Sequence, residues 1–237
     1  MIALLHAELL KLRTTRTFVA IVATATVLSL VLVALGAGLG VEKDPRALFT
    51  NNSITYIIVL LGAIGMTGEW RHRTITGTVL AAPDRLRLLA AKTLSYALAG
   101  IALSLLVTTT TMLVGTLILE AGGEPTLGLG GLADVLWRNL AVAALLGPLG
   151  VTIGALVRNQ IVTVVGLIAL ASILEPAVYQ VAPEVGRFGP MAGAPGGVLG
   201  GLGPDELAPG LAVAVLIAWV GAAFFAGAWR LRSRDLV

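Results

Sequence analysis

Six long stretches of this sequence contain no charged residue, and they restrict its possible folds more than any other feature. They cover residues 17–41, 47–68, 93–119, 139–157, 159–174 and 207–229. An α-helix rises 1.5 Å per residue, so about 20 residues cross the roughly 30 Å of hydrocarbon in a bilayer. Five of the six stretches are long enough for a crossing. The remaining one, residues 159–174, is slightly short because Glu175 follows it.

Lipid accepts a crossing backbone only as a helix or a closed barrel, and these stretches lack the polar alternation of barrel strands. Only 12% of the 237 residues are charged, about half the share typical of a soluble domain. We therefore predict an all-α, polytopic membrane protein with six transmembrane helices in one domain over residues 1–237. The expected spans are residues 17–41, 47–68, 93–119, 137–157, 160–181 and 207–229.

The basic residues predict how these spans are oriented. With the N-terminus inside the cell, twelve basic residues face the cytoplasm and four face outward. Cytoplasmic loops of membrane proteins carry an excess of Lys and Arg. The expected topology is a multi-pass protein of the cell membrane with both termini in the cytoplasm.

Residues 1–16 precede the first span and predict an interfacial helix. Ile2, Leu5, Leu9 and Leu12 recur at helical spacing, so one face of this helix is apolar. Such a helix lies on the cytoplasmic surface of the membrane. The alternative is a simple basic flank that orients the first span.

The longest cytoplasmic connection, residues 69–92, combines acidic, basic and helix-breaking residues. Glu69 and Arg73 have the i, i+4 spacing of a helical ion pair, and residues 74–78 are rich in Thr and Gly. Pro83 can occupy the first position of a new helix, with Asp84 in its first turn. We expect a short surface helix, a break, and a membrane helix that continues past Lys92. The alternative is that the basic residues here only set the topology.

The outward-facing connections differ from one another. Residues 120–134 are rich in glycine and predict a short exposed connection. Residues 182–206 are rich in proline and glycine but also apolar, so they predict either a folded, partly re-entrant segment or a plain mobile loop.

Glu175 is the main ionisable residue near the membrane edge. A helix from about Ile161 places it in the outer half of the hydrocarbon. It either lines an exit pathway or holds an outer gate, or else it extends to the lipid head groups because Pro176 ends the helix. Threonines 108–111 predict hydroxyls bonded to their own helix or packed between helices.

Several kinds of site are missing from the sequence. It has no GxxxxGK[ST] loop for ATP, no HExxH or GxSxG motif and no cysteine, and His6 and His72 are far apart. Its basic residues lie between apolar stretches, which does not indicate a nucleic-acid surface. We expect no enzymatic activity, bound metal or cofactor in this chain.

The cytoplasmic segment nevertheless resembles a known family. Gly68-Glu69-x-Arg71-x-x-Thr74, then Gly77-Thr78, Pro83, Arg85 and Ala91-Lys92, is similar to the permeases of type-2 ABC exporters. So is Glu8-x-x-Lys11-Leu12-x-x-Thr15, and so are Glu175 and Pro190 late in the chain. Asp84 departs from this pattern.

The resemblance implies a permease domain that moves an amphipathic or lipid-like compound or drug outward. It implies two copies of a cytosolic ABC ATPase, which hold ATP and Mg, and a second permease copy, identical or related. The coupling residues implied are Glu8, Lys11, Glu69, Arg71, Arg73, Thr74, Gly77, Thr78, Pro83, Arg85 and Lys92. The alternative function is a membrane scaffold or sensor that binds a cytosolic partner through residues 69–92 and transports nothing.

Overall fold

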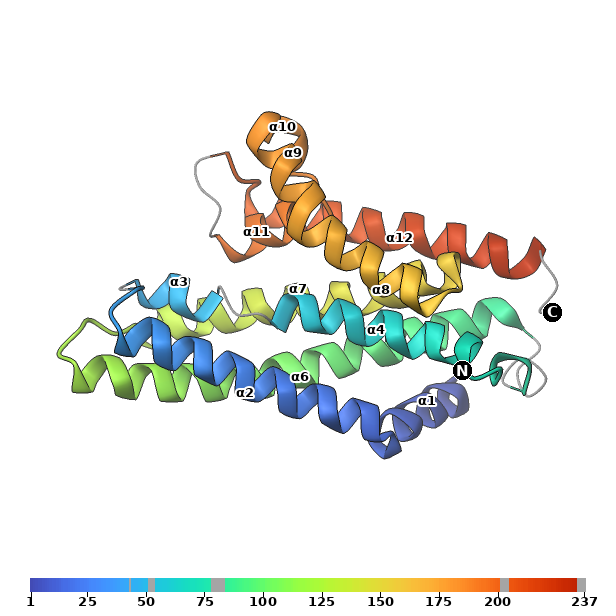
Figure 1. Cartoon of the computed structure of the whole chain (residues 1–237), viewed down its shortest axis with the longest axis horizontal. Helices are drawn as coiled ribbons and strands as arrows, with labels where there is room; N and C mark the ends of the chain where they lie inside the picture. The colour runs from blue at the N-terminus through green and yellow to red at the C-terminus, as the bar shows by residue number, and fades with distance from the viewer. Residues whose placement is uncertain (43, 51–53, 78–83, 201–204, 234–237) are drawn as a thin grey trace.

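The computed structural model describes residues 1–42, 44–50, 54–77, 84–200 and 205–233, and this part of the chain is helical without strands (Figure 1). Six helical segments are long and apolar enough to cross a membrane. The predicted all-α fold and the multi-pass membrane class are thereby confirmed. The segments are α2 (Arg16–Gly38), α3 with α4 (Pro45–Thr50, Ile54–Arg71), α6 (Arg85–Ala121), α7 (Leu129–Val157), α8 to α9 (Gln160–Val181) and α12 (Pro209–Ser233).

A short helix, α1 (Ile2–Thr14), precedes the first span, and it lies at the same end of the bundle as the end of α12 (Figure 1). We call this the termini end. The opposite end carries α3 and the short helices α10 (Pro183–Gly186) and α11 (Gly193–Leu199).

Helices α4 and α7 form the centre of the bundle. In the most apolar windows of the α3–α4 span and of α7, 67% and 61% of the residues are buried, against 17% in α2 and 22% in α12. Glycines allow this close packing: a Cβ on Gly62 would collide with the carbonyl oxygen of Gly147, and one on Gly150 with that of Val59. Small residues at helix crossings let membrane helices approach to backbone contact. Helix α6 joins the same unit, since a Cβ on Gly100 would lie 2.6 Å from the carbonyl oxygen of Ala143.

Helix α7 begins earlier than expected. Residues 120–134 were predicted to be an exposed connection, but α7 starts at Leu129. Leu132 and Val135 have helical spacing and belong to one apolar cluster with Val33 and Leu48, and Val135 is fully buried. The apolar contact therefore outweighs the two glycines in the first turn of α7.

The fifth span passes through Pro176 instead of ending there. Residues Leu170–Leu174 form a π-helical turn, and α9 (Glu175–Val181) continues from it. A proline inside a helix lacks its N–H and collides with the carbonyl four residues earlier. The wider π-turn accommodates this, so the segment reaches Val181, as the predicted bounds required.

The described part of residues 182–206 is folded. Helix α11 contacts α7 and α12, and its Ala194 and Val198 are fully buried. Trp219 of α12 donates its indole N–H to the carbonyl oxygen of Phe188 at 2.8 Å. Arg138 of α7 donates to the carbonyl oxygen of Val198 at 2.8 Å. These contacts exclude the plain-loop alternative for residues 182–200.

The threonines in α6 behave as predicted. Thr109, Thr110 and Thr111 donate their hydroxyls to carbonyl oxygens one turn earlier in their own helix. Thr108 is fully buried between helices.

Candidate functional site

The end of α4 places Glu69 at the termini end of the bundle. The Thr74 N–H donates to the Glu69 carbonyl at 2.9 Å and the Arg73 N–H to the Trp70 carbonyl at 3.2 Å, which is the Schellman pattern. Arg73 has the left-handed conformation that this turn requires, with φ of 56°. Glu69 therefore lies in the last turn of the second span, not in a separate surface helix.

Two expectations about this connection were wrong. Arg73 follows the helix end, so it is not placed for the predicted i, i+4 pair with Glu69. The break comes at residues 72–74, and a new helical turn begins at Ile75, where the Thr and Gly residues had predicted a break. Ile75 is buried, and this burial outweighs the low helix propensity of its neighbours.

Helix α6 begins at Arg85, two residues later than a start at Pro83. Asp84 is its N-cap and not part of its first turn, because the Asp84 carboxylate accepts from the N–H groups of Leu86 at 3.1 Å and Arg87 at 3.2 Å. A capping carboxylate satisfies amide groups that have no partner inside the helix. From there α6 runs without interruption through Lys92 into the third span, as predicted.

Helix α1 presents a mixed face to the bundle. Glu8 and Leu12 are buried, Leu5 and Leu9 are half-buried, and Ile2 is exposed. The acidic Glu8 thus belongs to the face that the leucine pattern had predicted to be apolar. This helix packs on α6.

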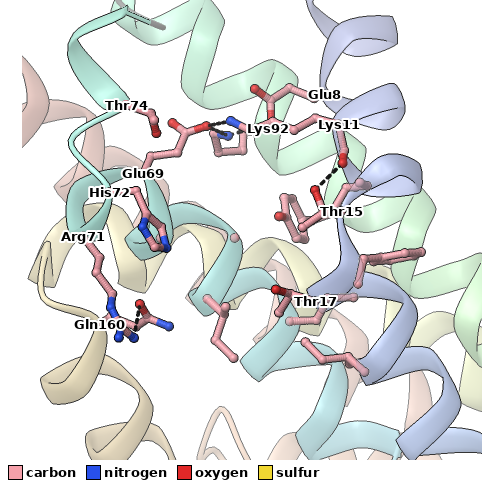
Figure 2. Close-up of a pocket in the computed structure, with 18 residues that line it drawn as sticks. Glu8, Lys11, Thr15, Thr17, Glu69, Arg71, His72, Thr74, Lys92 and Gln160 are labelled. Carbon is pink, nitrogen blue, oxygen red and sulfur yellow. Dashed lines mark hydrogen bonds and ion pairs between the residues drawn. The ribbon is translucent and has the colours of Figure 1, made fainter.

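These three helices meet in a cluster of four charged side chains, of which three are buried and Lys11 is half exposed (Figure 2). Lys92 donates to Glu8 at 2.6 Å and to Glu69 at 2.9 Å, and Lys11 donates to the same oxygen of Glu69. Lys92, Glu69 and Glu8 are only 1%, 3% and 7% exposed. We call Glu8, Lys11, Glu69 and Lys92 the ion cluster.

The charges of the ion cluster sum to zero, which is what allows them to be buried. A buried ion pair roughly balances its desolvation penalty, but removing one partner leaves an uncompensated charge. The second carboxylate oxygen of Glu69 is buried and accepts no hydrogen bond from the described residues. This second oxygen can accept a hydrogen bond from one of the lysines when the three helices change their relative positions.

A cavity of about 560 Å³ lies beside the ion cluster (Figure 2). It is bounded by α1, α2, α4 and α6 and by the first residue of α8. The residues that line it and carry charge or polar groups are Glu8, Lys11, Thr15, Thr17, Glu69, Arg71, His72, Thr74, Lys92, Tyr96 and Gln160.

The other predicted coupling residues are placed differently. Arg71 lines the cavity and donates to Gln160 at 3.4 Å, which links α4 to α8. Arg85 donates to the carbonyl oxygen of Leu231 at 2.5 Å, so it caps the end of α12, and it lines a second, small pocket together with Lys92. A Cβ on Gly77 would meet open space. Thr78 and Pro83 lie outside the described residues.

Glu175 is at the opposite end of the bundle. It is 6% exposed, and its carboxylate accepts from the N–H groups of Met191 at 2.9 Å, Ala192 at 2.6 Å and Gly193 at 3.3 Å. The side chain therefore points into the folded segment and does not extend to the surface, which excludes the head-group alternative. Its hydrogen bonds fix the turn that leads into α11.

Sequence reasoning missed three residues at the termini end. Tyr96 and Gln160 line the cavity, and Arg158 stacks on Trp70, with its guanidinium carbon 4.7 Å from the ring centroid. Arg158 also donates to the carbonyl oxygen of Arg230 and has the left-handed conformation at the end of α7. Residues 158 and 159 alone connect α7 to α8, and the shortness of this connection was the only available signal that the ends of several helices meet here.

A scan against protein-family models found no match for this chain, and a search of curated proteins found none either. The function of this chain therefore has to be inferred from the site itself and from the resemblance of its sequence pattern.

Proposed function

We propose that this protein is the membrane-spanning permease subunit of an ATP-driven exporter. A separate cytosolic ATPase subunit, in two copies, supplies ATP and Mg, and the permease moves an amphipathic compound outward across the cell membrane. Both termini face the cytoplasm in this proposal, as the basic residues predict.

The observation that carries the proposal is the ion cluster. The coupling residues implied by the sequence pattern come from segments far apart in the chain, and Glu8, Lys11, Glu69 and Lys92 meet in one ion-paired group. A partner that pushes on α1 or on the α4–α6 connection acts through this group on two spans. Residues 85–92 of α6 continue into its span as one helix, so a displacement at one end is transmitted rigidly.

The packing of the bundle supports a second permease copy. Helices α4, α6 and α7 approach to backbone contact at Gly62, Gly100 and Gly150, which leaves no room for a substrate among them. A pathway then has to follow an outer face of the bundle. Two copies related by symmetry enclose such a pathway between them.

Purification of the tagged chain from its native membrane tests this function. The proposal predicts a stoichiometric ATPase with a Walker-type nucleotide site, and ATP-dependent movement of an amphiphile after both proteins are reconstituted in vesicles. Recovery of a cytosolic partner without ATPase activity would favour the scaffold or sensor, and the exporter proposal would then be wrong.

A further inference from the structure

The cavity beside the ion cluster has two chemically different walls. Its apolar wall consists of Leu12, Phe18, Ile21, Leu61 and Ile64. The polar and charged residues come from the same helices, nearer the termini end, and from α6 and the first residue of α8. We propose that the cavity binds the anionic head group and the first part of the apolar tail of an amphiphile from the adjoining membrane leaflet.

The charges favour an anionic head group. Glu8 and Glu69 are already neutralised by Lys92 and Lys11. Arg71 therefore gives the residues that line the cavity a net positive charge. The side chain of Lys11 is 49% exposed and has three N–H donors, one of which goes to Glu69. Arg71 is exposed, and its contact with Gln160 is long for a hydrogen bond. Both cations can therefore turn donors toward a phosphate or carboxylate.

The apolar wall and a glycine provide space for the tail. Phe18 and Ile21 belong to α2, and Leu61 and Ile64 belong to α4, so they extend from the charged residues along the two spans. Gly68 lines the cavity, and a Cβ there would meet no atom within 4 Å. The first carbon of a side chain at residue 68 would therefore displace no neighbour.

Lipid binding by the purified permease alone tests this inference. The inference rests on the proposed function in one respect only, namely that the bound amphiphile is then transported. The purified full-length chain is equilibrated with phosphatidylglycerol or phosphatidylcholine in detergent, and retained lipid is counted by native mass spectrometry. One favourable charge contact predicts about fivefold more phosphatidylglycerol than phosphatidylcholine. The Arg71→Gln variant is expected to lose this preference, and Arg13→Gln, on the exposed part of α1, is expected to keep it.

Steric exclusion provides the second test. Gly68→Leu is expected to lower retained phosphatidylglycerol by about fivefold or more, because the added side chain removes the space for buried tail. Gly221→Leu is the matched control, since a Cβ at Gly221 in α12 also meets no atom within 4 Å and does not line the cavity. Release of the lipid by inorganic phosphate alone would assign the site to a soluble anion and overturn the proposal.

Equal retention of the two lipids, or equal loss in both glycine variants, would also overturn it. Neither result bears on whether an ATPase co-purifies with the chain. Failure of this inference is thus distinguishable from failure of the proposed function.

Discussion

Both ends of the bundle bury glutamate side chains, but they satisfy the buried charge in different ways. At the termini end Glu69 binds two lysines that come from different helices, α1 and α6. At the opposite end Glu175 binds backbone N–H groups 16 to 18 residues away in the chain. The first arrangement depends on the relative position of three helices, and the second fixes the shape of one local segment.

This difference indicates which end can respond to a partner. A shift of α1 relative to α4 and α6 changes the ion pairs of Glu69, whereas it leaves the amides around Glu175 in place. Variants of the ion cluster should therefore affect the whole bundle and its coupling, and variants of Glu175 should have local effects.

The largest expected effect is from Lys92→Met. It leaves Glu8 and Glu69 buried with only Lys11 to neutralise them, and breaking a buried pair costs about 3–5 kcal/mol. We expect a large fall in the apparent melting temperature of the detergent-purified chain. Lys92→Arg keeps the charge and is expected to lose much less. Equal stability of Lys92→Met and the native chain would show that the ion cluster does not hold the three helices together.

A smaller and local effect is expected from Glu175→Gln. The amide nitrogen of glutamine cannot accept from a backbone N–H, so at least one hydrogen bond to residues 191–193 is lost, at about 1–3 kcal/mol. Membrane insertion should be intact, while hydrogen exchange of these amides should accelerate. The control is Glu184→Gln, which alters an exposed glutamate close by. Unchanged exchange at residues 191–193 would contradict the assigned role of Glu175.

The smallest effect is expected from Arg85→Gln. Arg85 donates to the Leu231 carbonyl, and a single hydrogen bond of this kind contributes about 1 kcal/mol. Faster hydrogen exchange should be confined to the last turns of α12. Arg87→Gln serves as the comparison, because the Arg87 side chain is 72% exposed and pairs only with the neighbouring Asp84 among the described residues. A loss of stability as large as that of Lys92→Met would contradict this local role of Arg85.

The sequence predicted the six spans well because an uncharged apolar stretch has few alternatives in lipid. It predicted the helix ends less well, since those depend on single contacts. The side chain of Asp84 moved the start of α6, the turn at Arg73 ended α4 after Arg71, and the burial of Val135 extended α7 into a glycine-rich segment.

The candidate site was predictable in its residues but not in its pairing. Glu8, Lys11, Glu69 and Lys92 were all singled out, yet spacing along one helix suggested Arg73 as the partner of Glu69. The actual partners lie 58 and 23 residues away in sequence, and only the packing of α1 and α6 brings them together. The cavity had no sequence signal at all, because its walls come from five different helices.

The most direct test of the coupling role is the same substitution at the two ends of the bundle. Glu8→Gln removes one charge from the ion cluster but leaves Lys92 paired with Glu69, and Glu175→Gln removes one charge from the opposite end. Each variant is purified from its native membrane, and the ATPase that accompanies it is quantified by mass spectrometry relative to the permease. We predict less ATPase with Glu8→Gln and the native amount with Glu175→Gln. The native amount with Glu8→Gln, or a loss with Glu175→Gln alone, would contradict the proposal that the ion cluster is where the ATPase acts.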